Sequence, residues 1–332
     1  MPQNTEKILA ALGPLAGLYA DPHILEIMVD APERVLVEKD GRLEQAEVKF
    51  DSPEAIRALI DDLLALSGDA PAPGETILSI RFPGSEARGV AVLPPTAVQG
   101  PALVIRKLMN IGWISWEKLM EWGSVTPEVH AFLQQAVNEP VNILMAGGTG
   151  SGKTTVLSRL GELIPPERRL VVVENHHELQ IRHPGAVYLE AAGNPAVTML
   201  DLILTGSRMR PDWLIFGELQ GAEAMRVIEV LSRGYSGMAT IHGNSLEDTL
   251  LRLESMCLTA NMGLGLLEIR SLIASAFQLI CYQKHLPDGT RKLVEIAEVR
   301  GVENGGYVLE RLFRFDPEVG RLEATAVKPS WQ

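Results

Sequence analysis

Short runs of β-branched and other apolar residues dominate the first hundred positions of the chain, as expected for the strands of a small sheet. Segments 24–30 and 34–50 are the first two, and Asp40-Gly41 inside the second is a hairpin turn signal. Further strands are predicted at 77–82, 88–93 and 102–108.

One helix interrupts these strands. Its apolar residues recur at helical spacing, so that they share one face: Ile56, Leu59, Ile60, Leu63 and Leu64. Ser52 is the predicted N-cap, Pro53 takes the first helical position, and Gly68 ends the helix. Segment 69–75 is a loop, because its two prolines and glycine prevent regular structure. Strands and helix together predict a small α+β domain over residues 1–108.

The pattern changes after a predicted linker at 109–126, which mixes aromatic residues with glycines and shows no clear sheet pattern. Strands then alternate with helices, which favours a mostly parallel sheet covered by helices on both faces, over residues 127–332. The strands are expected at 141–146, 170–174, 187–190, 213–219 and 238–243, and the helices at 153–164, 198–209, 222–234 and 246–258. A last helix at 264–277 and antiparallel segments form the tail. The predicted fold class is therefore α/β.

Composition limits the class of protein. Of 332 residues, 46% are hydrophobic and 22% charged, as in soluble globular proteins, so a disordered chain is excluded. The net charge of −12 argues against a protein that coats nucleic acid through a global positive field. The N-terminus lacks the pattern of a secretory signal, and no apolar run reaches the length of a transmembrane helix. We therefore expect a cytoplasmic protein that does not insert into the membrane.

Cys257 and Cys281 are too few for a disulfide framework or a four-cysteine zinc site. We predict two structural thiols in a reducing compartment.

The strongest chemical signal is the segment GGTGSGKTT at 147–155. It fits the P-loop pattern, and it follows a predicted strand and precedes a predicted helix. Glycines let backbone N–H groups converge on phosphate oxygens, and the helix N-terminus adds positive potential. Lys153 is expected to reach the β- and γ-phosphates, and the Thr154 hydroxyl to ligate Mg²⁺. The predicted nucleotide-binding residues are Gly147, Gly148, Thr149, Gly150, Ser151, Gly152, Lys153, Thr154 and Thr155.

Polar groups end three later strands, where the ligands of an open α/β sheet gather. Glu218 follows the buried run 213–216, and its carboxylate is suited to hold Mg²⁺ through water or to polarise the attacking water. Glu174 ends another strand, with Glu178 one helical turn further on. His242 ends the strand at 238–243, although an isolated histidine is more often structural.

These segments together resemble the secretion and pilus-assembly ATPases of the type II/type IV superfamily. GGTGSGKTT is similar to their Walker A motif, LVVVENHHELQI to their acidic box, MRPDWLIFGELQGAEAMRVIEVLSRG to their Walker B stretch and YSGMATIHGNS to their histidine box. DPHILEIMVDAPERVLVEKDGRLE and PPTAVQGPALVIRKL resemble the N-terminal domain of the CpaF-type ATPases of the tad pilus, and LRLESMCL and IRSLIASAFQLI resemble that branch further on. The resemblance covers about residues 20–315.

The resemblance implies a small α+β domain followed by a RecA-like ATPase domain, with ATP and Mg²⁺ bound between the two. It implies a homo-hexamer at the cytoplasmic face of the inner membrane, working with platform membrane proteins of a pilus or secretion machine. By motif matching, Glu174 is the acidic-box carboxylate, Glu218 the Walker B glutamate, and His242 the histidine-box residue. The N-terminal domain is expected to lend arginines to the nucleotide, and Arg88 and Arg106 lie in the matching segments.

The chain also departs from the family pattern. Asn175 follows Glu174 where the acidic box usually continues with Asp, and Gln220 replaces the usual Walker B arginine. Gly243 stands where alanine is commoner, and the loop around 79–92 lacks the usual P-D-G-x-R-V-N form.

The sequence thus favours an ATPase that couples hydrolysis to mechanical work. Two alternatives stay open. One is a nucleotide-dependent scaffold or switch with little turnover, suggested by Asn175 and Gln220. The other is a DNA-translocating ring motor, which the acidic charge disfavours, so that no nucleic-acid partner is expected.

Overall fold

The computed structural model describes residues 2–39, 42–68, 71–85, 87–107, 111–191 and 196–331. The chain divides into two compact units, residues 1–110 and 111–332. Asp40 and Gly41, the predicted hairpin turn, lie outside the described residues.

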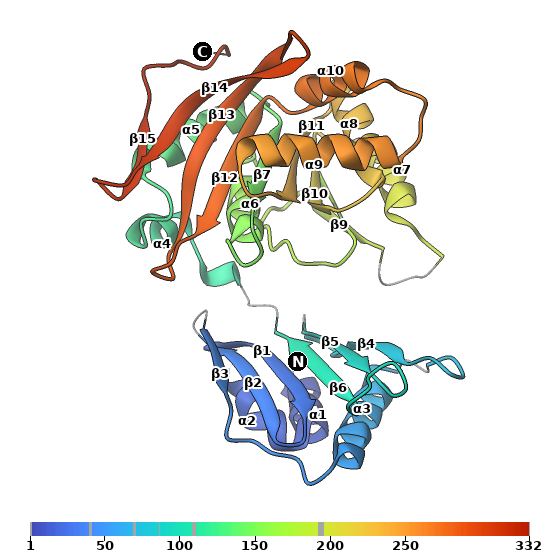
Figure 1. Cartoon of the computed structure of the whole chain (residues 1–332). Helices are drawn as coiled ribbons and strands as arrows, with labels where there is room; N and C mark the ends of the chain where they lie inside the picture. The colour runs from blue at the N-terminus through green and yellow to red at the C-terminus, as the bar shows by residue number, and fades with distance from the viewer. Residues whose placement is uncertain are drawn as a thin grey trace. The chain divides into compact units, whose positions relative to one another are not determined.

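The first unit is one antiparallel six-stranded sheet with helices on one of its faces (Figure 1). Its strand order is β3-β2-β1-β6-β5-β4. The strands are β1 (Ile24–Ala31), β2 (Arg34–Lys39), β3 (Arg42–Gln45), β4 (Ile77–Arg81), β5 (Arg88–Val92) and β6 (Ala102–Arg106). The helices are α1 (Pro2–Leu12), η1 (Gly13–Leu15), α2 (Ala16–Ala20) and α3 (Pro53–Ser67).

Helix α3 forms for the reasons that its sequence suggests. The Ser52 side chain accepts a hydrogen bond from the Ala55 amide, and Pro53 occupies the first turn. Gly68 ends the helix in the left-handed conformation, with φ of 77°. The buried residues of α3 are the five that the helical spacing predicts: Ile56, Leu59, Ile60, Leu63 and Leu64. Helices α1 and α2 were not predicted.

The second unit is built on a nine-stranded sheet of order β15-β14-β13-β12-β7-β11-β10-β8-β9. Strands β12, β7, β11, β10, β8 and β9 pair in parallel, and β12 to β15 pair antiparallel. The strands are β7 (Ile143–Gly147), β8 (Leu170–Glu174), β9 (Ala186–Glu190), β10 (Trp213–Leu219), β11 (Ser236–His242), β12 (Leu279–His285), β13 (Arg291–Glu303), β14 (Gly306–Asp316) and β15 (Arg321–Ala324). The predicted α/β fold with a mostly parallel sheet is confirmed.

Helices cover both faces of this sheet (Figure 1). On one face lie η2 (Ile111–Trp113), α4 (Trp116–Glu121), α5 (Pro127–Asn138) and α6 (Lys153–Glu162). On the other lie α7 (Met199–Arg208), α8 (Glu223–Ser232), α9 (Leu246–Thr259) and α10 (Leu266–Ala276). Successive residues of β7 divide between the two layers: Ile143 and Met145 join the first core, Leu144 and Ala146 the second. A strand buried on both faces therefore reads as a continuous apolar run.

The segment predicted as a linker, 109–126, carries η2 and α4 from Ile111 onward. Ile111, Ile114, Trp116 and Leu119 are buried in the core of the second unit. Aromatic and aliphatic residues at helical spacing fill this core, which explains why the segment shows no strand pattern.

Both cysteines are buried, Cys257 on α9 and Cys281 on β12. Burial, with the nearby Glu254 carboxylate, raises the pKa of Cys257 to about 12, and burial also raises the pKa of Cys281. Because only the thiolate is reactive, we expect neither thiol to react with a disulfide reagent in the native chain at pH 7, and both to react in urea. The absorbance of the chromophore that the disulfide reagent releases measures how many thiols react. Rapid modification of either thiol in the native chain would contradict the prediction.

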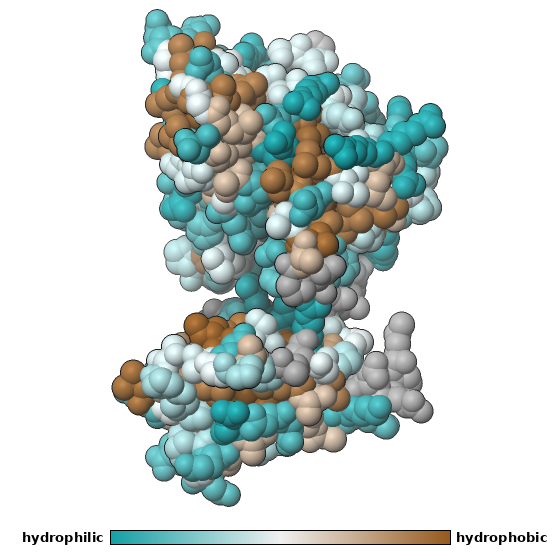
Figure 2. Space-filling view, turned by 90° about the vertical axis from the view of Figure 1, so that its right-hand side faces the viewer, coloured by the Kyte–Doolittle hydropathy of each residue, from teal (hydrophilic) through white to brown (hydrophobic). Residues whose placement is uncertain are grey.

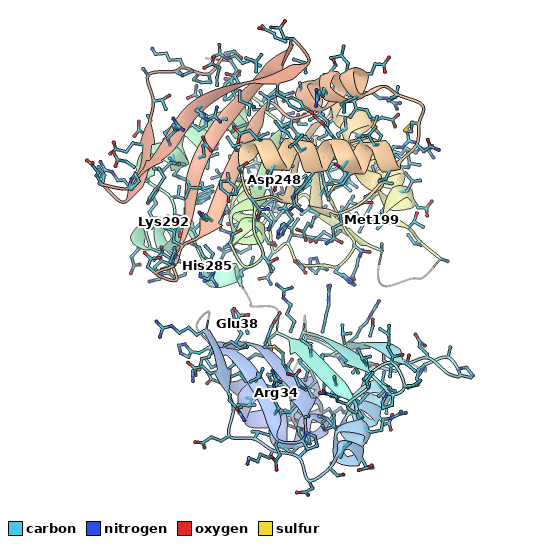
Figure 3. The ribbon with its side chains drawn as sticks, viewed as in Figure 1. Arg34, Glu38, Met199, Asp248, His285 and Lys292 are labelled. Atoms are coloured by element: carbon cyan, nitrogen blue, oxygen red, sulfur yellow. The ribbon has the colours of Figure 1, made fainter. Side chains whose placement is uncertain are left out.

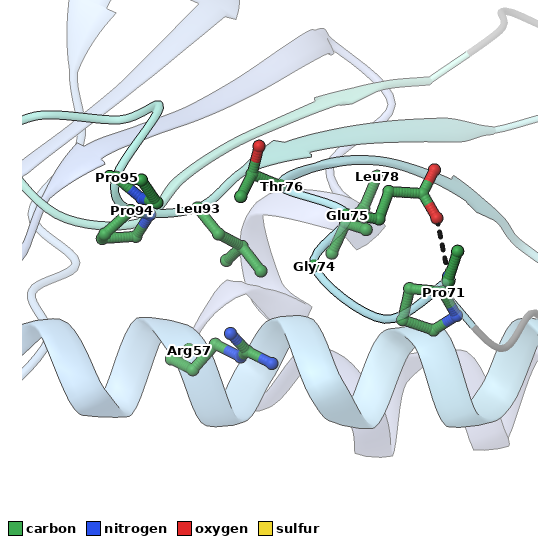
Figure 4. Close-up of a pocket in the computed structure, with 10 residues that line it drawn as sticks. Arg57, Pro71, Gly74, Glu75, Thr76, Leu78, Leu93, Pro94 and Pro95 are labelled. Atoms are coloured by element: carbon green, nitrogen blue, oxygen red, sulfur yellow. Dashed lines mark hydrogen bonds between the residues drawn. The ribbon is translucent and has the colours of Figure 1, made fainter.

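Each unit has a notable surface feature, and neither the pocket of the first unit nor the apolar patch of the second contains a predicted site residue. In the first unit a pocket opens between α3 and the strand ends, lined by Arg57, Pro71, Glu75 and Pro94 (Figure 4). In the second unit apolar side chains are exposed around the end of α9 and the start of α10, and Figure 2 shows apolar patches among polar residues on the side it views. They include Leu258, Met262, Leu264, Leu266 and Leu267.

None of the helices in the described part of the chain is long and apolar enough to cross a membrane.

Candidate nucleotide site

The segment 147–152 begins with the last residue of the parallel strand β7 and loops to the start of helix α6. Three of its glycines are required by conformation or space. Gly150 and Gly152 have φ of 69° and 92°, which side chains rarely adopt. A Cβ at Gly147 would lie 2.3 Å from the Gln283 carbonyl oxygen and 2.6 Å from Ser151 Oγ. The loop can therefore turn tightly against its neighbours only with glycine at these positions.

Lys153 is the first residue of α6 and is only 8% exposed. Its Nζ lies 2.9 Å from the carbonyl oxygens of both Gly147 and Gly148, so the ammonium is folded over the loop. The first amides of α6 have no partner one turn earlier in the helix. Cation and amides at a helix N-terminus make this loop suited to bind an anion such as a phosphate.

The remaining predicted groups end the strands beside β7. His242 is in register with Gly147 on the neighbouring strand β11. Glu218 lies near the end of β10, and Glu174 is the last residue of β8. Because β7, β11, β10 and β8 are consecutive and parallel, their carboxyl ends meet at one edge of the sheet. The structure thus brings Glu174, Glu218 and His242 to the edge that carries the loop.

Glu174 is 3% exposed, and both its carboxylate oxygens are engaged by the segment that follows it. Oε1 accepts hydrogen bonds from the amides of Glu178 and Leu179, at 3.0 and 2.9 Å. Oε2 lies 3.1 Å from Nδ1 of His177. These bonds order the loop, which is not helical at Glu178, so Glu178 is not placed one helical turn beyond Glu174.

Glu218 differs from Glu174 because its side chain is exposed. The register of β10 against β11 shifts between Phe216 and Glu218. A Cβ at the intervening Gly217 would approach Glu174 Cγ to 3.1 Å, so glycine lets the two glutamates lie on adjoining strands without a clash. Gln220 Nε2 donates to Glu218 Oε2 at 3.0 Å. An exposed carboxylate with one oxygen accepting from an amide remains available to a ligand.

Hard oxygen donors at this edge fit Mg²⁺. The Thr154 hydroxyl lies on the first turn of α6, and Glu218 supplies an exposed carboxylate. The described residues hold no group of three or more side chains that together form a metal cage. Mg²⁺ at nucleotide sites does not require one, because it takes one or two protein oxygens and completes its shell with phosphates and water.

Arg88 and Arg106 lie in the first unit, directly opposite each other on β5 and β6. Arg81 on β4 is opposite Arg88, which extends the row to three arginines. Arg106 also faces Glu26, whose carboxylate is 3.4 Å from its Nε, and Glu26 faces Glu38, labelled in Figure 3. The row thus runs from two glutamates, Glu38 and Glu26, to three arginines, so its positive charge gathers at the end on β5 and β4. Arg81 was not predicted, although its place on the exposed side of a strand could have been found from the alternation.

Three further residues near the loop were not predicted. Arg159, on α6, is fully buried. Gln283 on β12 is 2% exposed and lies beside Gly147 and Gly152. Arg291, the first residue of β13, donates from Nε to the Gly150 carbonyl oxygen at 2.7 Å. No local pattern marks Gln283 and Arg291, because strand pairing from more than a hundred residues away brings them to the loop.

A glycine-rich loop between a central parallel strand and a helix, with carboxylates on neighbouring strand ends, defines a P-loop protein. Residues 9–298 match the family described as "Type II/IV secretion system protein", and the chain belongs to this family.

Relatives of nearly the same length support the assignment. The "Putative conjugal transfer protein" of Mycobacterium tuberculosis strain H37Rv is 32% identical over 306 residues, which cover 89% of this chain and 86% of that protein. "Conjugal transfer protein TrbB" of Rhizobium radiobacter is 28% identical over 323 residues, 96% of this chain and 97% of that protein. The crystal structure of the Yersinia pseudotuberculosis ATPase DotB aligns with a TM-score of 0.61 at 16% identity, over 87% of this chain and 79% of that chain. The last similarity concerns the fold.

Proposed function

We propose that this chain is a motor ATPase of a type II/IV secretion or pilus-assembly machine, of the CpaF-type branch that serves tad pili. The observation that carries the proposal is the P-loop, held at the same sheet edge as Glu218, Glu174 and His242 in a member of the type II/IV secretion family. Its enzyme class is ATPase, and ATP with Mg²⁺ is its substrate.

The P-loop residues bind the phosphates. Lys153 exchanges its bonds to the Gly147 and Gly148 carbonyls for the β- and γ-phosphate oxygens, and the loop amides point at the same anion. The Thr154 hydroxyl and the Glu218 carboxylate hold Mg²⁺, directly or through water. The ion neutralises phosphate charge when it is bound.

Glu218 orients the attacking water, because it is the exposed carboxylate of the pair. Glu174 has a structural role beside Glu218. Its oxygens order the segment that follows β8, and its side chain packs against Gly217. His242 ends the strand next to the loop and serves as a polar contact for the phosphates. Arg88 and Arg106 supply the cations that stabilise the charge developing during hydrolysis.

The working form is a homo-hexamer in the cytoplasm, peripheral at the inner membrane and bound to platform membrane proteins. Exposed apolar side chains around α9 and α10, such as Leu258 and Leu267, support contacts with another protein. Binding of ATP then favours the assembled state, because a ligand stabilises the form that it binds best.

A second candidate is a scaffold that binds ATP but hydrolyses little. The observation that favours it is the Gln220 amide on the Glu218 carboxylate, because a neutral group occupies the place of the family's usual arginine. This candidate uses the same nucleotide site.

Two measurements on the full chain test these candidates. We expect steady-state phosphate release that requires both ATP and Mg²⁺ and stops on chelation, with the Lys153→Ala variant as the background control. Sedimentation at micromolar protein is expected to show hexamers with a non-hydrolysable ATP analogue. ATP binding without phosphate release would favour the scaffold, and a chain that stays monomeric with saturating nucleotide would contradict the motor.

A further inference from the structure

The start of β13 lies against the P-loop. Arg291 Nε donates a 2.7 Å hydrogen bond to the Gly150 carbonyl oxygen, across 141 positions of sequence. Its strand is fixed on both sides: Ser124 Oγ donates to the Arg291 carbonyl oxygen, and Arg291 pairs with His285 of β12. Figure 3 shows His285 and Lys292 at this end of the two strands. The backbone of Arg291 is therefore held in place where its side chain contacts the loop.

Gln283 on β12 gives a second, independent observation at the same place. The residue is 2% exposed, and its side-chain Oε1 has no hydrogen-bond partner among the described residues. Its backbone carbonyl group would collide with a side chain at Gly147. At Gly152 a Cβ would lie 3.0 Å from Gln283 Nε2 and 3.5 Å from Arg291 Cδ. The β12–β13 pair thus forms a wall along one side of the P-loop.

We propose that Arg291 is a positioning residue of the P-loop, which sets the direction of the peptide group between Gly150 and Ser151. This inference rests on the proposed function of the loop in nucleotide binding. A peptide group is planar and trans, so a carbonyl held towards β13 directs the N–H of the next residue the opposite way. The Ser151 N–H accordingly points into the loop, where the Gly148 carbonyl accepts it at 3.3 Å.

This loop needs such a support because four of its six residues are glycine. Glycine loses more backbone freedom on ordering than any other residue. A Cβ built on Gly150 would meet no atom of another segment within 4 Å, so the loop is not packed on that side of the residue. The Ser151 N–H, already turned into the loop, has only to exchange the Gly148 carbonyl for a phosphate oxygen, so nucleotide binding costs less reorganisation than in a loop whose peptide group is free to turn. Arg291 provides this order through one atom, Nε.

Three substitutions in the full chain separate donation by Nε from the charge of the side chain. Glutamine places its Nε2 at the position of arginine Nε, so Arg291→Gln keeps the donor and removes the charge. Arg291→Lys keeps the charge but has a carbon at that position, and Arg291→Ala keeps neither. The control is Arg300→Gln on the same strand, whose Nε donates to Glu298 Oε2 at 3.0 Å.

We expect the dissociation constant for ADP, measured by calorimetry, to rise about tenfold in Arg291→Ala and Arg291→Lys, equivalent to about 1.4 kcal/mol. Arg291→Gln and Arg300→Gln stay within about twofold of the parent. Hydrogen exchange of the peptide that contains 147–152, measured without nucleotide, is expected to be faster in the Ala and Lys variants only. Melting temperatures should be equal for the parent and the three Arg291 variants.

Several outcomes overturn the proposal. Parent-like affinity and exchange in Arg291→Ala mean that the bond has no role. Parent-like affinity in Arg291→Lys with a loss in Arg291→Gln means that the charge contacts the nucleotide directly. A loss of melting temperature that accompanies the loss of affinity means a structural role. If the parent itself bound no ADP, the proposed function would fail, while the exchange measurement would still decide whether Arg291 orders the loop.

Discussion

Replacing Glu218 with glutamine is expected to lower the turnover of ATP by about 10²-fold or more while leaving the affinity for ADP within about twofold. The side chain is exposed at the end of β10, and among the described residues its side-chain hydrogen bond is the one that Oε2 accepts from Gln220 Nε2. Glutamine keeps the shape but not the negative charge that orients water and holds Mg²⁺. Single-turnover hydrolysis together with calorimetric ADP binding measures the two effects separately.

Glu174→Gln is the matched comparison, because it removes the same charge from the neighbouring strand end. Here both oxygens accept hydrogen bonds within the protein, and the side chain is buried. We expect a loss of stability of about 1–3 kcal/mol, since an amide cannot accept at both oxygen positions. Turnover falls less than in Glu218→Gln. The reverse order of the two turnover losses would assign the water-orienting role to Glu174.

The sequence predicts best those features whose physical causes are local. The cap at Ser52, the apolar spacing within 53–67 and the stop at Gly68 all act within one helix, and the structure has each of them. The strand–loop–helix context of the P-loop is local in the same sense. The central parallel strands β7, β8, β10 and β11 were recognisable because burial on both faces makes most of each strand a continuous apolar run.

The missed features depend on contacts between distant segments. Residues 279–285 were not predicted as a strand, and β12 is the strand that places Gln283 beside Gly147. Helix α5 was also missed, although Thr126 caps it and Pro127 begins it. The burial of Arg159 could not be predicted, because arginine is seldom fully buried. No neighbouring residue in the sequence indicates the carbonyl groups that surround it.

Arg159 is at the centre of a buried polar cluster that links three segments. Its Nη1 donates to the Ile114 carbonyl oxygen at 2.8 Å and its Nη2 to the Gln180 carbonyl oxygen at 2.5 Å, while Glu162 Oε1 lies 3.1 Å from Nη2. Burial lowers the pKa of Arg159, an effect that the Glu162 carboxylate opposes, and a guanidinium stays protonated at pH 7 even so. The P-loop helix is thereby fixed to the segment after the unit boundary and to the segment after Glu174.

We therefore expect Arg159→Met to destabilise the chain by about 3–5 kcal/mol, because two buried carbonyl groups and a carboxylate lose their shared donor while the apolar side chain still fills the space. The control is Arg182→Met, which removes a 65% exposed arginine from the same Glu162 oxygen at 3.1 Å and should cost less than about 1 kcal/mol. Urea unfolding of parent, both single variants and the double variant measures the difference. A small effect of Arg159→Met would mean that water or rearranged backbone satisfies the Ile114 and Gln180 carbonyls. A double variant that is no worse than Arg159→Met alone would show that the exposed pair of Arg182 and Glu162 depends on the buried one.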